Sequence, residues 1–219
     1  MIDVEGRRLR GRVVWVLVPL IIIGLVAAGL WWQPWHKRSV ELPQSACWGV
    51  LTTDDYRILA GDDGKATAVT AGTIDGPYPQ KAPNQQCWLP WSGSRYPMLT
   101  VEISPAINNN GARDVTAFAE GGSASPVNFG ADGAGWVATG KLSVVELYLT
   151  CDYRQASTFP LFAEPYLEVN VSGAVGISSA PQAQIRQAFA DIALKLAKAV
   201  AHRVPCANQV RLVDQAPKV

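Results

Sequence analysis

The side chains that most often carry out chemistry in proteins are sparse in this chain. It has two histidines, His36 and His202, and neither belongs to a metalloprotease, phosphate-loop, calcium-loop or serine-nucleophile motif. A Ser-His-Asp arrangement would have to use one of them. His202, however, lies on the polar stripe of a predicted helix, where a solvated side chain is the simpler interpretation. We therefore assign no catalytic residue, no metal site and no cofactor from the sequence.

Carboxylates are the remaining source of acid–base chemistry. Glu102, Glu146 and Glu168 occupy polar positions of predicted strands, and paired acids can hydrolyse glycans. The simpler interpretation is that these glutamates face solvent. Asp54 and Asp55 have a sufficient role near a predicted helix N-terminus, where negative charge is favourable. A cell-envelope hydrolase that uses acidic residues therefore remains an alternative.

The cysteines predict cross-links instead of nucleophiles. Cys47, Cys87, Cys151 and Cys206 form an even set, and in an exported domain such a set indicates two disulfides. Cys151 lies on the apolar face of a predicted strand, and Cys206 follows a helix whose apolar stripe needs a sheet to cover it. A bond between them would fix that helix to the sheet and leave Cys47 for Cys87. Two other pairings remain possible.

Tryptophans are the most distinctive residues of the part that follows the apolar segment. Trp48 and Trp88 each adjoin a cysteine, and we expect both to pack over that disulfide. Trp91, in a Pro-Trp-Ser-Gly turn, is instead expected to be exposed. Trp and Arg carry much of the energy at binding surfaces, so Trp91, Arg95 and Tyr96 are the candidate partner-binding residues.

An apolar segment near the N-terminus predicts where the chain is located. Residues 13–32 contain no charge, and a helix of that length spans about 30 Å, the thickness of a bilayer's hydrocarbon core. The flanking positive charges favour a cytoplasmic N-terminus; they are Arg7, Arg8, Arg10 and Arg12 before the segment, and Lys37 and Arg38 after it. The outer membrane interface is predicted at Trp31, Trp32 and Trp35.

A cleaved signal peptide is the competing interpretation of this segment. The apolar run is longer than is usual for one, and Trp-Trp-Gln-Pro at residues 31–34 is a poor cleavage site. We therefore expect residues 1–12 in the cytoplasm, a transmembrane helix at 13–32, a stalk at 33–45 and an extracytoplasmic domain at 46–219. The net charge is +1, with no basic block beyond the N-terminal arginines, so a nucleic-acid surface is not expected.

Hydrophobic periodicity predicts an α+β domain with a mainly antiparallel sheet packed by helices. A short helix follows Thr52 and ends at Gly61, and a long one runs from a cap at Ser178 or Ser179 to Pro205. Strands alternate at 99–104, 145–151 and 166–172, and more weakly at 114–118 and 135–139. Loops are expected at 75–86, 107–113 and 120–135. Because each clear strand is apolar on one face only, helices should cover one face of the sheet.

The first part of this domain resembles a known group. Residues 46–55 read ACWGVLTTDD and are followed by Leu59-Ala60-Gly61 and later by Gln86-Cys87-Trp88. This pattern is similar to the opening of small actinobacterial exported and lipoprotein domains of unknown function, and it implies an α+β fold like that of the PsbP and Mog1 proteins. The match covers residues 46–89. The chain departs from the group in carrying a transmembrane segment where the group has a lipid-modified cysteine, and the resemblance brings no catalytic residues.

These observations favour a membrane-anchored extracytoplasmic binding or assembly module of the bacterial cell envelope, without catalysis. Its expected partners are the lipid bilayer and an envelope protein or glycan. Besides the hydrolase, a second alternative is an accessory subunit of a larger membrane complex. In that case Gly24 and Gly29 would let another helix approach closely.

Topology is the first testable prediction. Protease added to intact spheroplasts should remove the domain, because the N-terminal arginines retain residues 1–12 in the cytoplasm. The measurement is the size of the fragment that stays attached to a tag at residue 1. A protected domain together with a cleaved tag would show the opposite orientation.

Overall fold

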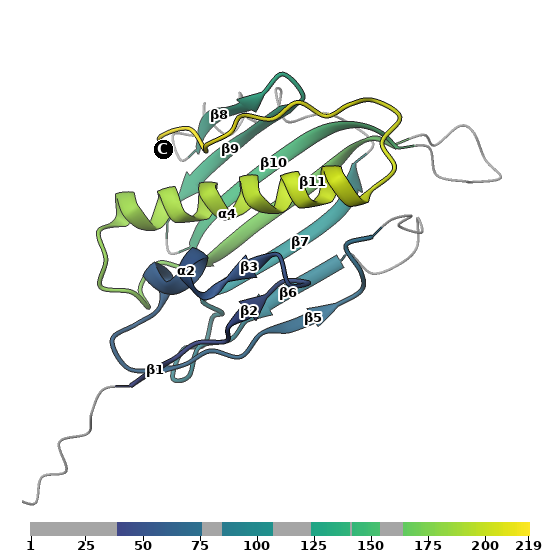
Figure 1. Ribbon diagram of the computed structural model, residues 1–219. Helices are drawn as coiled ribbons and strands as arrows, with labels where there is room; N and C mark the ends of the chain where they lie inside the picture. Colours follow the sequence, from purple (N-terminus) through teal and green to yellow (C-terminus); the bar gives the residue numbers. More distant parts are fainter. Residues whose placement is uncertain (1–38, 76–84, 107–123, 141, 154–163) are drawn as a thin grey trace, which may run out of the picture. The chain divides into compact units, whose positions relative to one another are not determined.

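The computed structural model describes residues 39–75, 85–106, 124–140, 142–153 and 164–219. Over these residues the chain is α+β, with a seven-stranded antiparallel sheet in the order β5-β6-β7-β11-β10-β9-β8 and the long helix α4 across one face (Figure 1). The sheet strands are β5 (Val69–Ala71), β6 (Gln85–Leu89), β7 (Leu99–Ala106), β8 (Ala124–Gly130), β9 (Gly133–Thr139), β10 (Leu142–Tyr153) and β11 (Glu164–Ala174). The fold class predicted for the domain is confirmed.

Short elements before the sheet complete the described part of the chain. They are β1 (Val40–Glu41), β2 (Ser45–Ala46), β3 (Leu51–Thr52), α2 (Thr53–Tyr56), the 3₁₀ turn η1 (Arg57–Leu59) and β4 (Gly64–Lys65). β1 pairs with β4 and β2 with β3, so residues at the end of the predicted stalk already form strand pairs.

The predicted membrane anchor cannot be compared with this architecture. Residues 13–32 and the interface residues Trp31, Trp32 and Trp35 lie outside the described residues. Among the residues that are described, no helix combines the length and the apolar composition needed to cross a bilayer.

Alternation along the central strands builds the core. Odd-numbered apolar residues of β7, β10 and β11 all point to the side of α4 and are fully buried; they are Leu99, Val101, Ile103, Val145, Leu147, Leu149, Leu167, Val169 and Val171. The predicted strand positions are therefore confirmed, and the opposite side of each strand is left polar.

Helix α4 (Gln182–Arg203) covers this apolar face. Its predicted stripe is buried in full and packs on β10 and β11; it consists of Ile185, Phe189, Ile192, Leu196 and Val200. The predicted serine cap is wrong, because Pro181 occupies the N-cap position. The Ser178 hydroxyl donates instead to the Ile58 carbonyl oxygen at 2.6 Å, which ties the approach to α4 to the 3₁₀ turn η1.

The start of α2 also joins α4. The Asp55 carboxylate accepts from the backbone N–H of Thr52 at 2.6 Å, as a capping box requires, and it pairs with the Lys195 ammonium at 2.6 Å. Burial opposes ionisation of Asp55, but the hydrogen bonds from Lys195 and Thr52 outweigh it and lower its pKa. The carboxylate therefore stays charged and links the short helix to the long one.

Both disulfides form with the predicted pairing. Cys47 bonds Cys87 and ties the turn before β3 to β6, with 5.2 Å between the Cα atoms. Cys151 bonds Cys206 and ties β10 to the segment after α4, with 5.0 Å between the Cα atoms. The bridges close loops of 40 and 55 residues, and in the chain-entropy model each contributes about 4 kcal/mol.

Two loop predictions fail. β8 and β9 cover most of residues 120–135, which were expected to be a loop, and β6 begins at Gln85 within the expected loop 75–86. The Gly-, Ser- and Pro-containing sequence of β8 has low strand propensity, so pairing with β9 decides its conformation. The weak strand at 135–139 is confirmed as part of β9, and the one expected at 114–118 lies outside the described residues.

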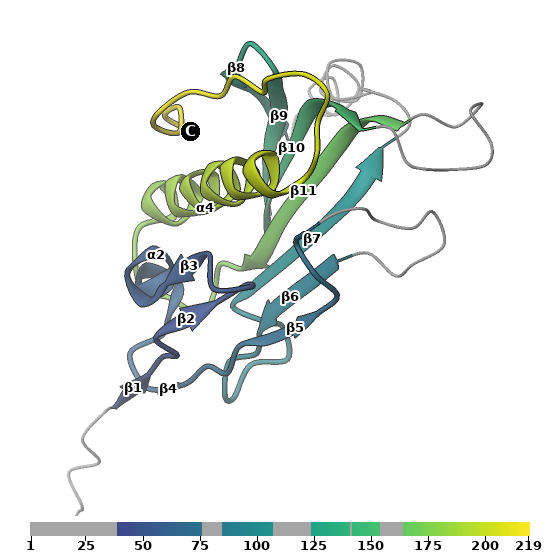
Figure 2. The ribbon, with the colours of Figure 1, turned by 45° about the vertical axis from the view of Figure 1, so that its right-hand side comes forward.

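Residues 206–219 form a segment that the periodicity did not predict, and we call it the C-terminal strap. After α4 it turns back over the β8–β9 hairpin and runs beside the helix (Figures 1 and 2). The backbone N–H of Val213 donates to the Phe129 carbonyl oxygen at 2.8 Å. The Lys198 ammonium donates to the Asp214 carbonyl oxygen at 2.9 Å. The strap is thus bonded to both layers.

Trp91 is buried, with 7% of its surface exposed, so the expectation that it forms an exposed contact is wrong. Its backbone bridges Ala66, and its ring lies over Gly61 and Gly64. A Cβ at Gly64 would meet that ring at 2.8 Å, so the two glycines make room for the indole. The turn signal was correct, but it did not show which way the ring points.

Trp91→Ala should therefore destabilise the domain by about 3–5 kcal/mol, because a large buried ring leaves a cavity. Tyr96→Ala is the matched control from the same loop; its side chain is 53% exposed, and it should change stability by less than about 0.5 kcal/mol. Urea unfolding of both variants measures the difference. Equal midpoints would show that Trp91 is not a core residue.

Candidate functional site

The sheet face opposite α4 carries an ordered row of polar side chains. Strand register places the row straight across β6, β7, β11, β10 and β9; its members are Gln86, Glu102, Asn170, Glu146 and Trp136. The next row holds Ser104, Glu168 and Tyr148. We call these two rows the outer sheet face. Neighbouring members lie on strands about 5 Å apart, so they form one continuous surface.

Glu146 is held in place by its neighbours. Its carboxylate accepts from the Tyr148 hydroxyl at 3.0 Å and from the Asn170 amide at 3.1 Å. Both donors come from strand positions, one on the same strand and one on β11. Hydrogen bonds to a charged acceptor are the stronger kind, so they fix the direction of this carboxylate.

Glu168 has a different electrostatic environment. Burial, followed by the negative charges of Glu146 and Glu102, raises its pKa to about 7, and a hydrogen bond from Asn170 partly offsets this. Near neutral pH the group is therefore present in both its protonated and its ionised form. The strand glutamates lie on the face away from the core, as expected, but all three are half-buried and so are less solvated than predicted.

Aromatic side chains flank these carboxylates. Trp136 and Tyr148 are buried on this face, with 5% and 8% of their surface exposed, while Trp88 and Tyr166 are half-buried. Trp88 was expected to pack over the Cys47–Cys87 bridge. Alternation along β6 instead turns Cys87 toward the core and Trp88 away from it. Trp48 does pack against the core, and its indole N–H donates to the Gly72 carbonyl oxygen at 3.1 Å.

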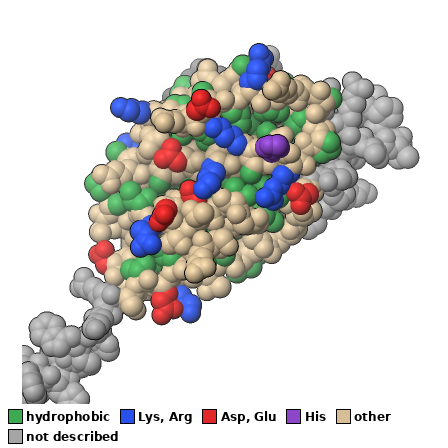
Figure 3. All heavy atoms as spheres, viewed as in Figure 1, with side chains coloured by type: hydrophobic (Ala, Val, Ile, Leu, Met, Phe, Trp, Pro, Cys, Tyr) green, Lys and Arg blue, Asp and Glu red, His purple; other side chains and the backbone are tan. Residues whose placement is uncertain are grey.

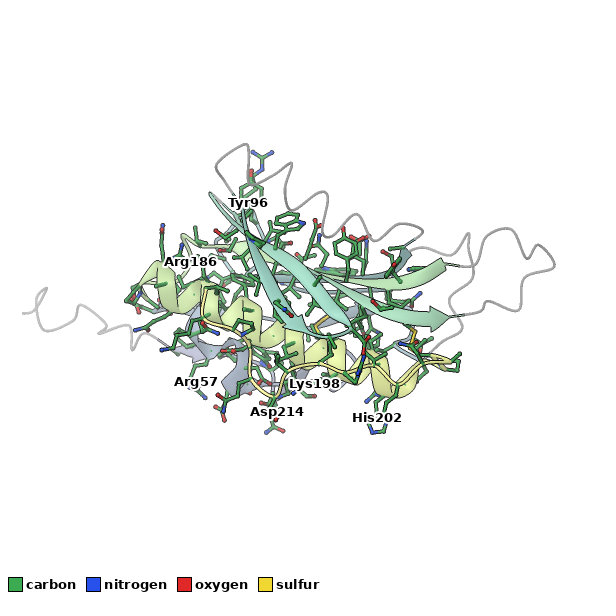
Figure 4. The ribbon with its side chains drawn as sticks, turned by 90° about the horizontal axis from the view of Figure 1, so that it is seen from above. Arg57, Tyr96, Arg186, Lys198, His202 and Asp214 are labelled. Carbon is green, nitrogen blue, oxygen red and sulfur yellow. A yellow bond between two sulfur atoms is a disulfide. The ribbon has the colours of Figure 1, made fainter. Side chains whose placement is uncertain are left out.

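The predicted partner-binding segment divides into two parts. Trp91 belongs to the core, whereas Arg95 and Tyr96 are exposed, with the guanidinium 5.9 Å from the ring centroid. Figure 4 shows Tyr96 on the side of the sheet that faces away from α4. The exposed part of the predicted segment is therefore on the same side as the outer sheet face.

The α4 side of the domain has a different character. Lysines, arginines and carboxylates alternate over it, together with His202 (Figure 3). A groove of about 560 Å³ there is lined by both signs of charge, including Asp55, Lys195 and Asp214. His202 is exposed, as predicted. His36 lies outside the described residues.

The chemistry of the outer sheet face is that of hydrogen bonding to a polar ligand beside aromatic rings. Carboxylates accept hydrogen bonds there, amide and hydroxyl groups donate and accept them, and the half-buried rings of Trp88 and Tyr166 offer flat apolar contact. Among the described residues, no three His, Cys, Asp or Glu side chains converge closely enough to hold a metal ion. The three glutamates are thus near enough to affect one another's charge, but they do not form a chelating cluster.

Sequence reasoning identified each glutamate and missed the arrangement. Glu102, Glu146 and Glu168 come from three strands whose order in the sheet differs from their order in the chain. The signal that could have found them is the repetition of a glutamate near the middle of each long strand.

Comparisons of the chain with models of protein families, with curated proteins and with solved structures found no match.

The raised pKa of Glu168 predicts a pH dependence of stability. Its pKa lies above the ordinary value of 4.5, so the folded state holds more protons than the unfolded state between these values. The contribution of this group is greatest below pH 4.5 and is lost as the pH rises through 7. The shift corresponds to roughly 3 kcal/mol before solvent screening, and partial exposure reduces this to about 1–2 kcal/mol.

Urea unfolding at pH 5 and pH 8 measures this loss. Glu168→Gln should remove most of it, and Asp191→Asn on the exposed side of α4 should leave it unchanged. A wild-type profile that is flat between these pH values would contradict the raised pKa.

Proposed function

We propose that this chain is a membrane-anchored binding or assembly module of the bacterial cell envelope, with its domain outside the cytoplasmic membrane and its ligand contact on the outer sheet face. The ligand class that fits this surface best is an envelope glycan, since carboxylates, an amide and aromatic rings are the groups that hold polyols. The predicted anchor and the two disulfides support the location.

The observation that carries this proposal is that the glutamates of the outer sheet face lower the stability of the fold. Glu168 lies diagonally from Glu146 on β10 and from Glu102 on β7. Both negative charges oppose its ionisation, so placing the three glutamates at the centre of the sheet costs stability. Burial and this repulsion together raise the pKa of Glu168 to about 7. Residues that lower stability at a rigid, central position are best explained by contact with a ligand.

The rigidity of this surface also suits binding. Its residues lie on strands of a seven-stranded sheet, and hydrogen bonds hold Glu146. Preorganised groups lose little entropy when a ligand binds. Exposed Arg95 and Tyr96 on the adjacent loop would extend the contact.

Binding of the full-length protein in detergent micelles to an isolated cell-wall glycan fraction tests the proposal. Glu146→Gln and Tyr96→Ala should each weaken binding about tenfold, because a hot-spot contact is worth roughly 1–2 kcal/mol. Asp191→Asn on the α4 side is the matched control and should bind like the wild type. Unchanged binding in both outer-face variants would rule out this surface.

The same surface supports a second candidate, a cell-envelope hydrolase. A carboxylic acid with a pKa of about 7 beside other carboxylates resembles the acid and base pair that glycan hydrolysis requires. Release of reducing ends from the same glycan fraction measures this activity. Glu168→Gln should abolish release if Glu168 is the acid, whereas binding without release by the wild type would leave the non-catalytic module.

A further inference from the structure

The two disulfides differ in how a reagent can reach them. Cys47, Cys87 and Cys151 have no exposed surface. Cys206 alone is partly exposed, and it lines a groove of about 470 Å³. Both cysteines of the Cys47–Cys87 bridge are thus enclosed, while the Cys151–Cys206 bridge has one partly exposed cysteine.

This groove is formed between the end of α4 and the C-terminal strap. The helix contributes Lys198, Ala201 and His202, and the strap contributes residues on either side of Gln209. Figure 4 shows Lys198 and His202 on the same side of the molecule, opposite the side that carries Tyr96. The Lys198 ammonium gives this groove a positive charge. A positive charge attracts an incoming thiolate, which is the attacking species in disulfide exchange.

We propose that Cys206 is a thiol–disulfide exchange site, through which an external dithiol protein of the thioredoxin class reduces the Cys151–Cys206 bond. In the first step a thiolate of that protein bonds the Cys206 sulfur, and the Cys151 sulfur leaves with the electron pair and takes a proton from water. In the second step the other thiol of the reductant displaces Cys206 and closes the reductant's own disulfide. Two electrons thus pass from the dithiol protein to the domain. The Cys151–Cys206 bond is reduced, and the dithiol protein is oxidised to its own disulfide.

Attack at the other sulfur is excluded by burial, because Cys151 lies within the sheet side of the core. The same argument applies to both sulfurs of the Cys47–Cys87 bridge. The enclosed bridge therefore exchanges only after unfolding, and the bridge at the groove exchanges in the folded protein. This inference does not depend on the proposed ligand.

Reduction would remove the covalent tether of the strap. Contacts to the hairpin would remain. They include the Arg211–Asp132 ion pair at 3.1 Å, the bond from the Val213 N–H to the Phe129 carbonyl oxygen, and the bond from the Asp132 N–H to the Arg211 carbonyl oxygen at 3.2 Å. Arg211 donates to Asp132 and holds the pKa of that carboxyl below its ordinary value. The strap also fits against bare glycine backbone, since a Cβ at Gly130 would lie 2.6 Å from the Arg211 carbonyl oxygen. Asn208 also donates to the Thr150 carbonyl oxygen at 2.8 Å, and Val210, Leu212 and Val213 pack against the core. These contacts hold the strap on the domain after reduction, so exchange at Cys206 does not require the domain to unfold.

Differential alkylation of the full-length protein in micelles tests the site. With dithiothreitol under native conditions, Cys151 and Cys206 should be alkylated at least tenfold faster than Cys47 and Cys87, as measured by peptide mass spectrometry. A thioredoxin-type protein that lacks its second cysteine should be trapped as a mixed disulfide on Cys206. Equal or reversed rates for the two bridges, or trapping on Cys151, would overturn the proposal.

A groove-filling variant separates access from stability. Ala201→Phe places a ring in the groove and should slow reduction of the Cys151–Cys206 bond several-fold without changing the urea midpoint of the oxidised protein. Ala183→Phe, at an exposed position in the first turn of α4, is the control and should leave the rate unchanged. A wild-type rate for Ala201→Phe would show that reagents do not enter through the groove, and would overturn the proposal.

Discussion

Burial of one helical stripe on one face of the sheet is the interaction on which the rest of the domain depends. The stripe of α4 packs over β10 and β11, whose inward residues are fully buried. Because side chains alternate along a strand, covering one face also decides which residues make up the other. The polar rows around Glu146 and Glu168 are therefore a direct consequence of where α4 lies.

The two disulfides stabilise different parts of this arrangement. The Cys47–Cys87 bridge joins the turn before β3 to β6, and the Cys151–Cys206 bridge joins the segment after α4 to β10. Between them they connect segments that are separated by 40 and 55 residues. The short elements before the sheet depend on such connections, since strands of two residues cannot be stable alone.

The sequence predicted those features of the fold that depend on a local pattern of apolar and polar residues. The α4 stripe and the alternation of β7, β10 and β11 follow from spacing that can be read along the chain. The cysteine pairing was inferred from the expected packing of that helix on the sheet, with two other pairings left open. β8 was missed because strand pairing, and not propensity, sets its conformation. The direction of Trp91 was missed because it depends on Gly61 and Gly64, which lie before and within β4, a distant part of the sequence. The outer sheet face needs the order of strands that are not neighbours in sequence, and no local pattern contains that order.

The C-terminal strap has one more physical effect, which concerns the last strand of the sheet. Among the strands that the structure describes, β8 pairs with β9 alone, and open strand edges invite pairing with other molecules. The Val213 N–H already occupies the Phe129 carbonyl on that free side, and Pro126 within β8 has no N–H to offer. Residues 206–219 thus help to keep the sheet from growing by a further strand, and they protect the domain against self-association through this edge.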